Sequence, residues 1–223
     1  MKNIDLSAAH CGTGEVKKEY YSINMETDKE KRKLLLHSCC GPCSTACIER
    51  LVPDFKVTIF YYNPNITEKE EYEKRKENQI KFIDKYNESL PEEDRIRFIE
   101  GEYIPEDFFE AASGLENEPE GGKRCTECFK LRLRRTAEVA LETGNTIFGT
   151  TLTVSPHKNY PLISEIGKNL AMVCGLEFLD VDFKKKDGYK RSIELSKEYG
   201  LYRQNTCGCI FSDWRIKTED KEK

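Results

Sequence analysis

The chain has 223 residues, a formal net charge of -4 and ten cysteines. A chain of this length can bury a complete hydrophobic core, and it suggests one domain rather than two. No stretch approaches the roughly 20 apolar residues of a membrane span, and the first 30 residues lack an apolar signal region, so we expect a cytoplasmic protein. A long chain rich in Lys and Glu does not resemble a small secreted disulfide scaffold, and its cysteines therefore favour metal or redox chemistry.

Residues 1–30 are expected to form a polar extension, in which 20–24 could add an edge strand, and residues 31–223 a single domain. In that domain, strand-like segments alternate with segments of helical periodicity. Strands are expected at 33–38, 56–62, 95–103, 146–153 and 177–183. Helices are expected at 43–51, 68–90, 126–144, 162–175 and from 188 onward, with a loop-rich stretch around PEGG and a cysteine-bearing tail. This order predicts an α/β fold with a parallel, doubly wound sheet and helices on both faces.

The carboxyl edge of this sheet is the expected working site, because ligands of open parallel sheets bind outside the carboxyl ends of the strands. His37 to Cys40 leave the first strand, and Cys43 and Cys47 follow on the first helix. The loops that carry Cys125 and residues 151–157 should reach the same edge. For His37, a structural role is favoured over a role as proton donor. For His157, which lies in a loop, contact with a ligand and a structural role are equally expected.

Two cysteine groups could hold a metal. Cys40, Cys43 and Cys47 share one helical face, with Cys39 just before the helix, and at least two of them could ligate one metal. Cys125 and Cys128 form a CxxC at the start of a basic helix. The helix N-terminus and its basic neighbours would favour the thiolate, which is the ligating form. CC plus CxxC supplies four soft ligands, which suit either an iron–sulfur cluster or a structural zinc.

The remaining cysteines divide into a reactive pair and isolated thiols. Cys207 and Cys209 flank one glycine, a spacing that can close a strained, redox-active disulfide or supply extra zinc ligands. Cys47 and Cys174 read as small buried hydrophobes, and Cys11 as incidental.

Two basic runs could contact phosphates, although each could equally be a solvated helix face. Residues 123–135 hold six basic residues against one Glu, and residues 184–191 hold five against one Asp.

Five segments together resemble the QueH family of epoxyqueuosine reductases. They are LLLHSCCGPCS, NPNI, RCTECFKLRL, FGTTLTVSPHKNY and YRQNTCGCIFS, and they run in the family's order from Leu34 to Ser212. The resemblance implies a Rossmann-like (HUP-type) α/β domain that reduces epoxyqueuosine to queuosine at the wobble position of tRNA. This is the last step of queuosine formation, and the family performs it without cobalamin.

The resemblance also implies a set of site residues. A [4Fe-4S] cluster would be held by Cys39, Cys40, Cys125 and Cys128, with exchange of one of them for Cys43 or Cys47 left open. Cys207 and Cys209 would be a redox-active catalytic pair that passes electrons or donates a proton. A second, mononuclear iron has been proposed for the family near the position of Cys43, where some members have Asp. A thiolate is a softer ligand than a carboxylate, so the presence and identity of this second metal stay open for this chain.

The expected partners are tRNA carrying epoxyqueuosine and an electron donor that the sequence does not identify; it leaves the oligomeric state open as well. The residues expected to contact tRNA are Lys123, Arg124, Arg132, Lys184, Lys185 and Lys190, with Tyr202 or Tyr189 stacking on a base.

Three other functions compete with this interpretation. An ATP-pyrophosphatase-type tRNA-modifying enzyme needs a Gly-rich SGGxDS loop after the first strand, where this chain has HSCCGPCS. A zinc-stapled RNA-binding module would use the cysteines only to hold loops together. A general thiol–disulfide oxidoreductase would leave the CC pair without a role.

Overall fold

The computed structural model describes residues 30–212, so the proposed extension and its edge strand lie outside the described residues. Five parallel strands form one sheet in the order β3-β2-β1-β4-β5. The strands are β1 (Arg32–Ser38), β2 (Phe55–Tyr61), β3 (Arg97–Glu100), β4 (Ile147–Thr150) and β5 (Glu177–Phe178). The predicted α/β fold with an all-parallel sheet is confirmed.

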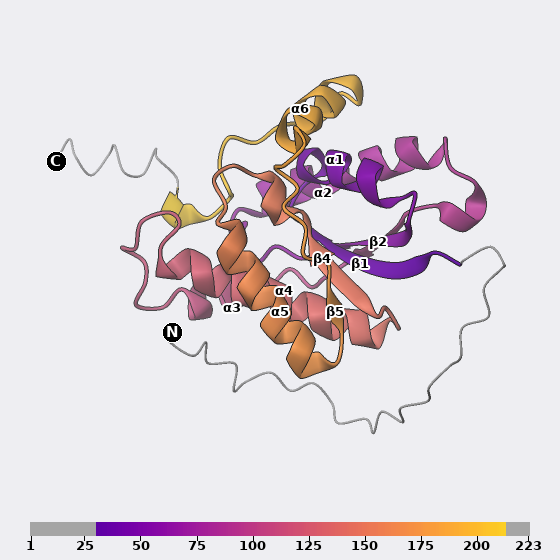
Figure 1. Ribbon diagram of the computed structural model, residues 1–223. Coiled ribbons are helices and arrows are strands. Elements are labelled where there is room, and N and C mark those ends of the chain that lie inside the picture. The colour runs from indigo at the N-terminus through magenta and orange to yellow at the C-terminus, as the bar shows by residue number, and fades with distance from the viewer. Residues whose placement is uncertain (1–29, 213–223) are drawn as a thin grey trace.

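Helices cover both faces of the sheet (Figure 1). They are α1 (Gly41–Leu51), α2 (Lys69–Asn87), α3 (Pro105–Ala111), α4 (Lys123–Glu142), α5 (Tyr160–Cys174) and α6 (Gly188–Glu198). Leu34 and Leu36 of β1 pack in one core cluster with α1 and α2, while Leu35 packs in a second cluster with α4 and α5. Successive side chains of a strand point to opposite faces, so the apolar run of β1 supplies both cores.

The chain departs from the expected elements in three places. The segment 177–183 contributes only two residues to the sheet, since its neighbour β4 ends at Thr150; beyond them, Asp180 makes an ion pair with Lys168 at 2.5 Å and accepts a hydrogen bond from Tyr160 at 2.9 Å. After Thr150 the chain forms the 3-10 turn η2 (Thr151–Val154) instead of continuing the strand. The helix α3 lies in the stretch expected to be loop-rich.

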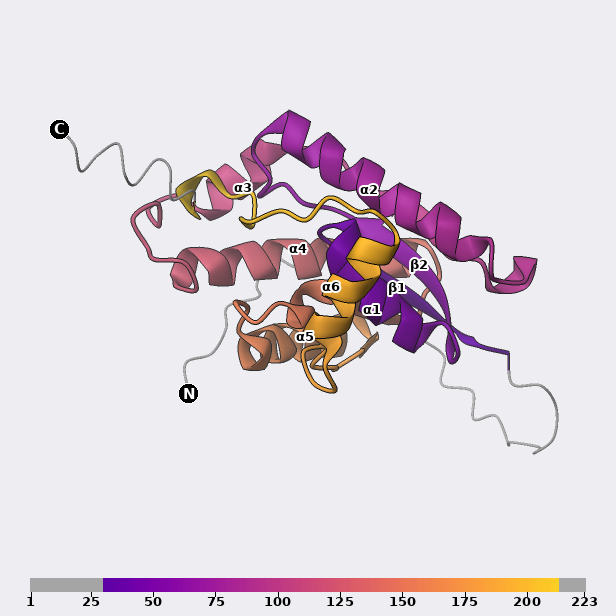
Figure 2. The ribbon, with the colours of Figure 1, turned by 90° about the horizontal axis from the view of Figure 1, so that it is seen from above.

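The strand order reverses between β1 and β4: from β1 the chain adds β2 and β3 on one side of the sheet, and it then adds β4 and β5 on the other side. In doubly wound sheets the crevice at such a reversal is the usual ligand site. A segment after α6, residues 200–209, crosses this edge beside α2 and leads to the 3-10 turn η3 (Ile210–Ser212), as Figure 2 shows from above. We call residues 200–209 the strap. Among residues 30–212, no helix has both the length and the apolar content needed to cross a lipid bilayer.

Candidate active site

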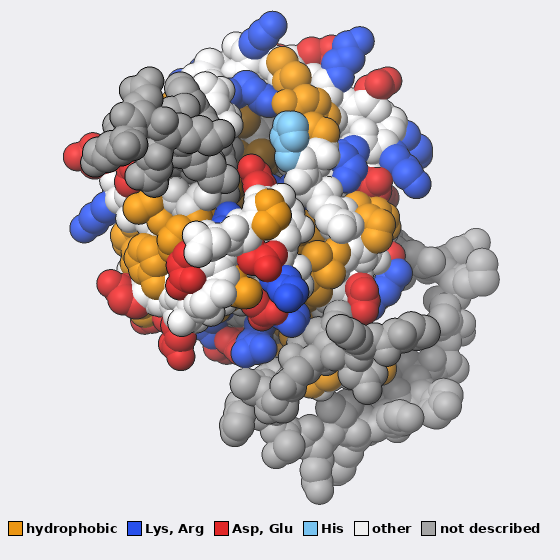
Figure 3. All heavy atoms as spheres, turned by 90° about the vertical axis from the view of Figure 1, so that its left-hand side faces the viewer, with side chains coloured by type: hydrophobic (Ala, Val, Ile, Leu, Met, Phe, Trp, Pro, Cys, Tyr) orange, Lys and Arg blue, Asp and Glu red, His pale blue; other side chains and the backbone are white. Residues whose placement is uncertain are grey.

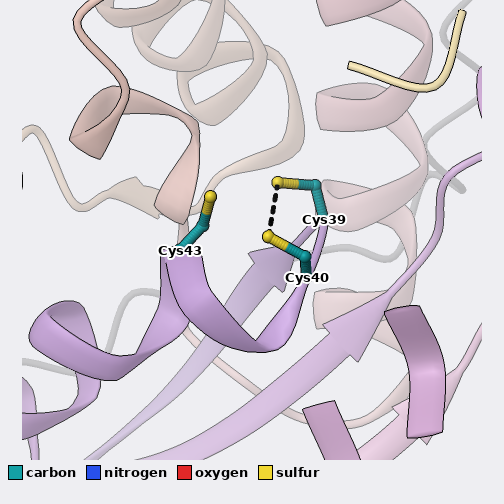
Figure 4. Close-up of side chains that lie close together, drawn as sticks. All are labelled: Cys39, Cys40 and Cys43. Atoms are coloured by element: carbon teal, nitrogen blue, oxygen red, sulfur yellow. Dashed lines mark hydrogen bonds between the residues drawn. The ribbon is translucent and has the colours of Figure 1, made fainter. Parts of the chain in front are cut away.

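Three cysteine sulfur atoms meet where β1 passes into α1. The Sγ atoms of Cys39, Cys40 and Cys43 all lie within 4.8 Å of one another, and a hydrogen bond of 3.9 Å links Cys39 to Cys40 (Figure 4). We call these three residues the cysteine trio. Such a group offers soft ligands to one metal centre.

Close packing of α1 against α2 fixes the trio. A side chain at Gly41 would place its Cβ 2.6 Å from the carbonyl oxygen of Asn78 on α2, so only glycine allows the first turn of α1 to sit there. Pro42 occupies the start of α1, where its missing N–H costs nothing. The trio therefore lies at a rigid junction of strand and helix.

The thiols of the trio differ in acidity. Hydrogen bonds with the Cys40 and Cys43 thiols hold the pKa of Cys39 well below its usual range, and Arg132 adds to this effect. Burial raises the pKa of Cys40 to about 12. Hydrogen bonds with Cys39 and Cys40 raise the pKa of Cys43 well above its usual range. Cys39 is therefore the first of the three to become a thiolate.

His37, just before the trio, has a structural role. Its Nδ1 lies 3.0 Å from Thr150 Oγ1 and its Nε2 lies 3.0 Å from the carbonyl oxygen of Tyr62. The ring is fully buried, and desolvation lowers its pKa to about 4, so it remains neutral. His37 thus ties β1 to β4 and to the end of β2.

The other two cysteine pairs meet beside the trio. Cys125 and Cys128 on α4 and Cys207 and Cys209 on the strap line a small cavity of about 20 Å³. Gly208 between the last two has a φ of +86°, which lets the chain turn sharply there. A hydrogen bond with Cys207 and burial together raise the pKa of the Cys209 thiol.

The expected four-cysteine set is thus divided between two neighbouring groups. Among the described residues, the trio is the one metal-capable group whose ligand atoms approach within 4.8 Å, and Cys125 and Cys128 are not part of it. Cys47 is fully buried in the core, as predicted, and Cys174 packs against the second core cluster while only partly buried.

A larger cleft of about 490 Å³ opens over the trio, and Cys39, Cys43 and Cys207 line it. Figure 3 looks onto this face and shows a hollow beside a histidine side chain and several Lys and Arg side chains. The charged lining is mostly basic and consists of Arg75, Arg132, Lys158, Arg203 and Glu120. The cleft therefore favours an anionic ligand.

Arg132 and Lys158 line both the cleft and the small cavity, so they join the two groups of cysteines. Arg132 is 4% exposed and packs its guanidinium over the ring of Phe129. Although burial opposes it, Cys207 and Glu120 raise the pKa of Lys158, so this side chain remains a cation. These two charges can compensate the negative charge of cysteine thiolates.

The residues expected to contact tRNA occupy different positions. Lys123, Lys185 and Lys190 are exposed, and Lys184 is half-buried with its Nζ donating to the carbonyl oxygen of Lys158 at 3.1 Å. Arg132 lies inside the cleft.

The expectation that Arg124 contacts a phosphate is wrong. Arg124 is 1% exposed, and its guanidinium donates to the carbonyl oxygens of Leu115, Glu116 and Glu118. These carbonyl groups belong to a loop and are not paired within a helix or strand, so Arg124 supplies their donors and holds the loop before α4.

The two candidate stacking tyrosines also differ. Tyr202 does not line the cleft: its hydroxyl donates to Glu71, and Lys74 Nζ lies 3.6 Å from its ring centroid. Tyr189 lines the cleft, and the Arg203 guanidinium lies 5.8 Å from its ring centroid. His157 is exposed at the same cleft.

Several cleft residues escaped the sequence analysis, among them Arg75, Lys158 and Gln204. Gln204 Nε2 donates to Cys40 Sγ at 2.8 Å. Gln204 and Lys158 lie in the segments YRQNTCGCIFS and FGTTLTVSPHKNY, so their proximity to the cysteine and histidine motifs was the available signal. Arg75 lies in a helix with many charged residues of both signs, so the sequence gives no signal that this one is buried at the cleft.

Comparison with known proteins gives a single family. The model of the family described as "Epoxyqueuosine reductase QueH" matches residues 34–215. A protein of that name from Staphylococcus epidermidis is 44% identical over 189 residues, which cover 84% of this chain and 79% of the relative. Relatives of the same name from Streptococcus pyogenes (39% identical, 84% of this chain and 72% of the relative) and Thermotoga maritima (38% identical, 80% and 89%) also match. The chain belongs to the QueH family of epoxyqueuosine reductases.

Proposed function

We propose that this chain reduces epoxyqueuosine to queuosine at the wobble position of tRNA, without cobalamin, and uses a [4Fe-4S] cluster bound by Cys39, Cys40, Cys125 and Cys128. The observation that carries the proposal is the cysteine trio, placed at the crevice of the sheet beneath a basic cleft in a member of this family. The enzyme is an oxidoreductase that acts on tRNA, so we place it in the cytoplasm.

The residues present fit such a cluster. The trio provides converging thiols, and the CxxC lies beside it across Arg132 and Lys158, which line both cavities. Cysteine thiolates are the ligands that iron–sulfur clusters use, and nearby cations stabilise their negative charge. Cys43, the third member of the trio, would then contact a second iron.

The reaction needs two electrons and two protons, because removal of the epoxide oxygen leaves an alkene and water. When bound, a [4Fe-4S] cluster supplies low-potential electrons one at a time. The chain itself supplies the enclosure: a cleft of about 490 Å³ has the size of pockets that hold a single small molecule, such as one splayed nucleoside. Cys207 lines this cleft, with the Cys209 thiol behind it, and the pair either passes electrons or donates a proton.

The tRNA would approach over α6 and the strap. Lys184, Lys185 and Lys190 lie around the start of α6, and Tyr189 between them reaches the cleft. We therefore propose that these lysines contact phosphates and that Tyr189 stacks on a base. Lys123, exposed at the start of α4, is a further candidate for phosphate contact.

The experiment that tests this function is mass spectrometry of nucleosides from epoxyqueuosine-containing tRNA. The iron-loaded protein is incubated anaerobically with this tRNA and dithionite, with no cobalamin added. We expect queuosine to replace epoxyqueuosine. Intact epoxyqueuosine alongside a reducible iron–sulfur cluster would remove the substrate from the proposal, and a colourless zinc protein without labile sulfide would support the RNA-binding module instead.

A further inference from the structure

The strap is held along its backbone by side chains of α2. Lys81, Asn78 and Arg75 lie on one face of this helix, at spacings of three residues. Their contacts with the strap are Lys81 Nζ to the carbonyl oxygen of Gly200 (2.7 Å), the N–H of Tyr202 to Asn78 Oδ1 (2.8 Å), and Arg75 to the carbonyl oxygens of Thr206 (3.3 Å) and Cys207 (3.2 Å). These contacts hold the backbone of the strap at both ends and on either side of Gln204.

Gln204 lies midway along this anchored segment and turns its side chain toward the trio. Its Nε2 donates to Cys40 Sγ at 2.8 Å, and Cys40 is fully buried. Its Oε1 is buried and accepts no hydrogen bond within the part of the chain that the structure describes. A ligating thiolate is an acceptor only, so the amide presents its N–H to the sulfur.

An N–H donor on a ligating sulfur changes the electronic properties of the metal centre. The hydrogen bond withdraws negative charge from the sulfur, and this stabilises the reduced state more than the oxidised state because the reduced state carries the additional electron. In a buried site the effect is larger, because the low local dielectric strengthens the interaction. A donor at this position raises the reduction potential.

We propose that Gln204 is a positioning residue that raises the reduction potential of the iron–sulfur centre through its hydrogen bond to Cys40. This inference rests on the proposed cluster. Because the same strap continues to Cys207 and Cys209, Gln204 also links the reactive pair to the centre that would supply its electrons. The strap backbone is anchored by α2, so loss of the Gln204 amide removes the donor and leaves the path of the chain unchanged.

The test is an anaerobic redox titration of the reconstituted full chain, followed by electron paramagnetic resonance and without tRNA. Three variants are compared with the parent: Gln204→Leu, Gln204→Glu and Tyr202→Phe. We expect a more negative midpoint potential for Gln204→Leu, and a still more negative one for Gln204→Glu, which keeps the length of the side chain but adds a carboxylate beside the sulfur. Tyr202→Phe removes the hydroxyl that contacts Glu71, elsewhere on the strap, and should leave the potential unchanged.

Equal potentials in the parent and in both Gln204 variants would overturn the inference. An equal shift in Tyr202→Phe would also overturn it, because the shift would then come from a loosened strap. If Gln204→Leu did not retain the cluster, Gln204→Glu carries the comparison, since it preserves the shape of glutamine. The expected shifts in a protein that fails to form queuosine would leave this inference standing and remove only the substrate, whereas failure of the parent to bind a cluster would overturn both.

Discussion

Arg75 Nη1 donates a hydrogen bond to the carbonyl oxygen of Cys207 at 3.2 Å, although 132 positions separate the two residues in the sequence. Arg75 is 1% exposed, and Glu71 accepts from its Nε at 2.7 Å. Asn65 adds a second donor to the same carbonyl oxygen at 3.2 Å. A buried cation with a carboxylate and two carbonyl groups as partners therefore fixes the segment of Cys207 and Cys209 against α2.

Replacement of this cation should loosen the strap. In Arg75→Met, the carbonyl oxygen of Thr206 loses its side-chain donor and that of Cys207 keeps only Asn65, and we expect a loss of about 3 kcal/mol in the free energy of unfolding. Denaturant unfolding of the full chain measures this loss. In the same variant, iodoacetamide should modify Cys207 faster than in the parent.

Lys76→Met is the matched control, because Lys76 is the next residue on α2 and pairs with Glu73 and Glu100 near the surface. Near-surface ion pairs contribute about 0 to 1 kcal/mol, so this variant should lose little stability. Equal losses in the two variants would show that Arg75 has no special role in holding the strap.

The proposed cluster ligands predict a pattern of iron binding. Replacement by Ser of Cys39, Cys40, Cys125 or Cys128 should abolish the cluster, because a [4Fe-4S] centre uses one thiolate for each iron. Iron and acid-labile sulfide after anaerobic reconstitution measure the result. Cys43→Ser should keep the cluster and lose only additional iron.

Cys47→Ala is the control for this series, since its buried thiol donates to the carbonyl oxygen of Cys43 and points into the core. It should retain full iron and sulfide. Loss of the cluster from Cys47→Ala, or its retention in one of the four ligand variants, would require a different ligand set.

Much of the fold was predictable because strong local patterns agree with the tertiary structure. The apolar run after Lys33 and the amphipathic periodicity of α2 and α4 each indicate the correct element. The short β5 was not predictable, because the alternation of 177–183 is that of a strand. The pairing neighbour β4 ends at Thr150, so the later residues of this segment have no strand beside them, and Asp180 contacts Tyr160 and Lys168 instead.

The sequence indicated which kinds of side chain form the site, but not how they are arranged in space. Cysteine spacing indicated that thiols around the start of α1 could bind a metal, but it did not single out Cys39, Cys40 and Cys43. Nor could spacing show that Cys207 and Cys209 would line a small cavity together with Cys125 and Cys128. Burial of a charged residue is equally invisible in sequence. Arg124 reads as one more member of a basic run, and only the fold shows that backbone carbonyl groups surround it.

If Cys207 and Cys209 act as proton donors, their loss should slow the reaction even when a chemical reductant supplies the electrons. If Cys207 and Cys209 donate a proton, replacement of both by Ser should slow formation of queuosine at least about tenfold even with dithionite present. Single-turnover assays on epoxyqueuosine-containing tRNA measure this rate, with Cys47→Ala as the baseline. Undiminished turnover of the double variant with dithionite would exclude proton donation by these thiols and leave only a role in electron delivery.

The basic residues differ in their freedom to contact tRNA. Lys185 and Lys190 are exposed around the start of α6, and Lys184 lies half-buried beside them. Lys33 and Lys56, paired in register on β1 and β2, lie at the opposite, amino edge of the sheet. A tRNA bound over the cleft should therefore contact the lysines around the start of α6 and not Lys33 or Lys56.

Replacement of Lys184, Lys185 and Lys190 by Gln should flatten the salt dependence of tRNA binding. For every lysine that pairs with a phosphate of a single-stranded loop, its replacement should reduce the slope of log K against log salt by about 0.7, because fewer counterions are released. Fluorescence anisotropy with an anticodon stem-loop at several salt concentrations measures the slope. The double variant Lys33→Gln, Lys56→Gln removes charge from the far edge and should keep the parent slope. An unchanged slope in the triple variant would exclude the start of α6 as a phosphate-binding surface and direct attention to Lys123 on α4.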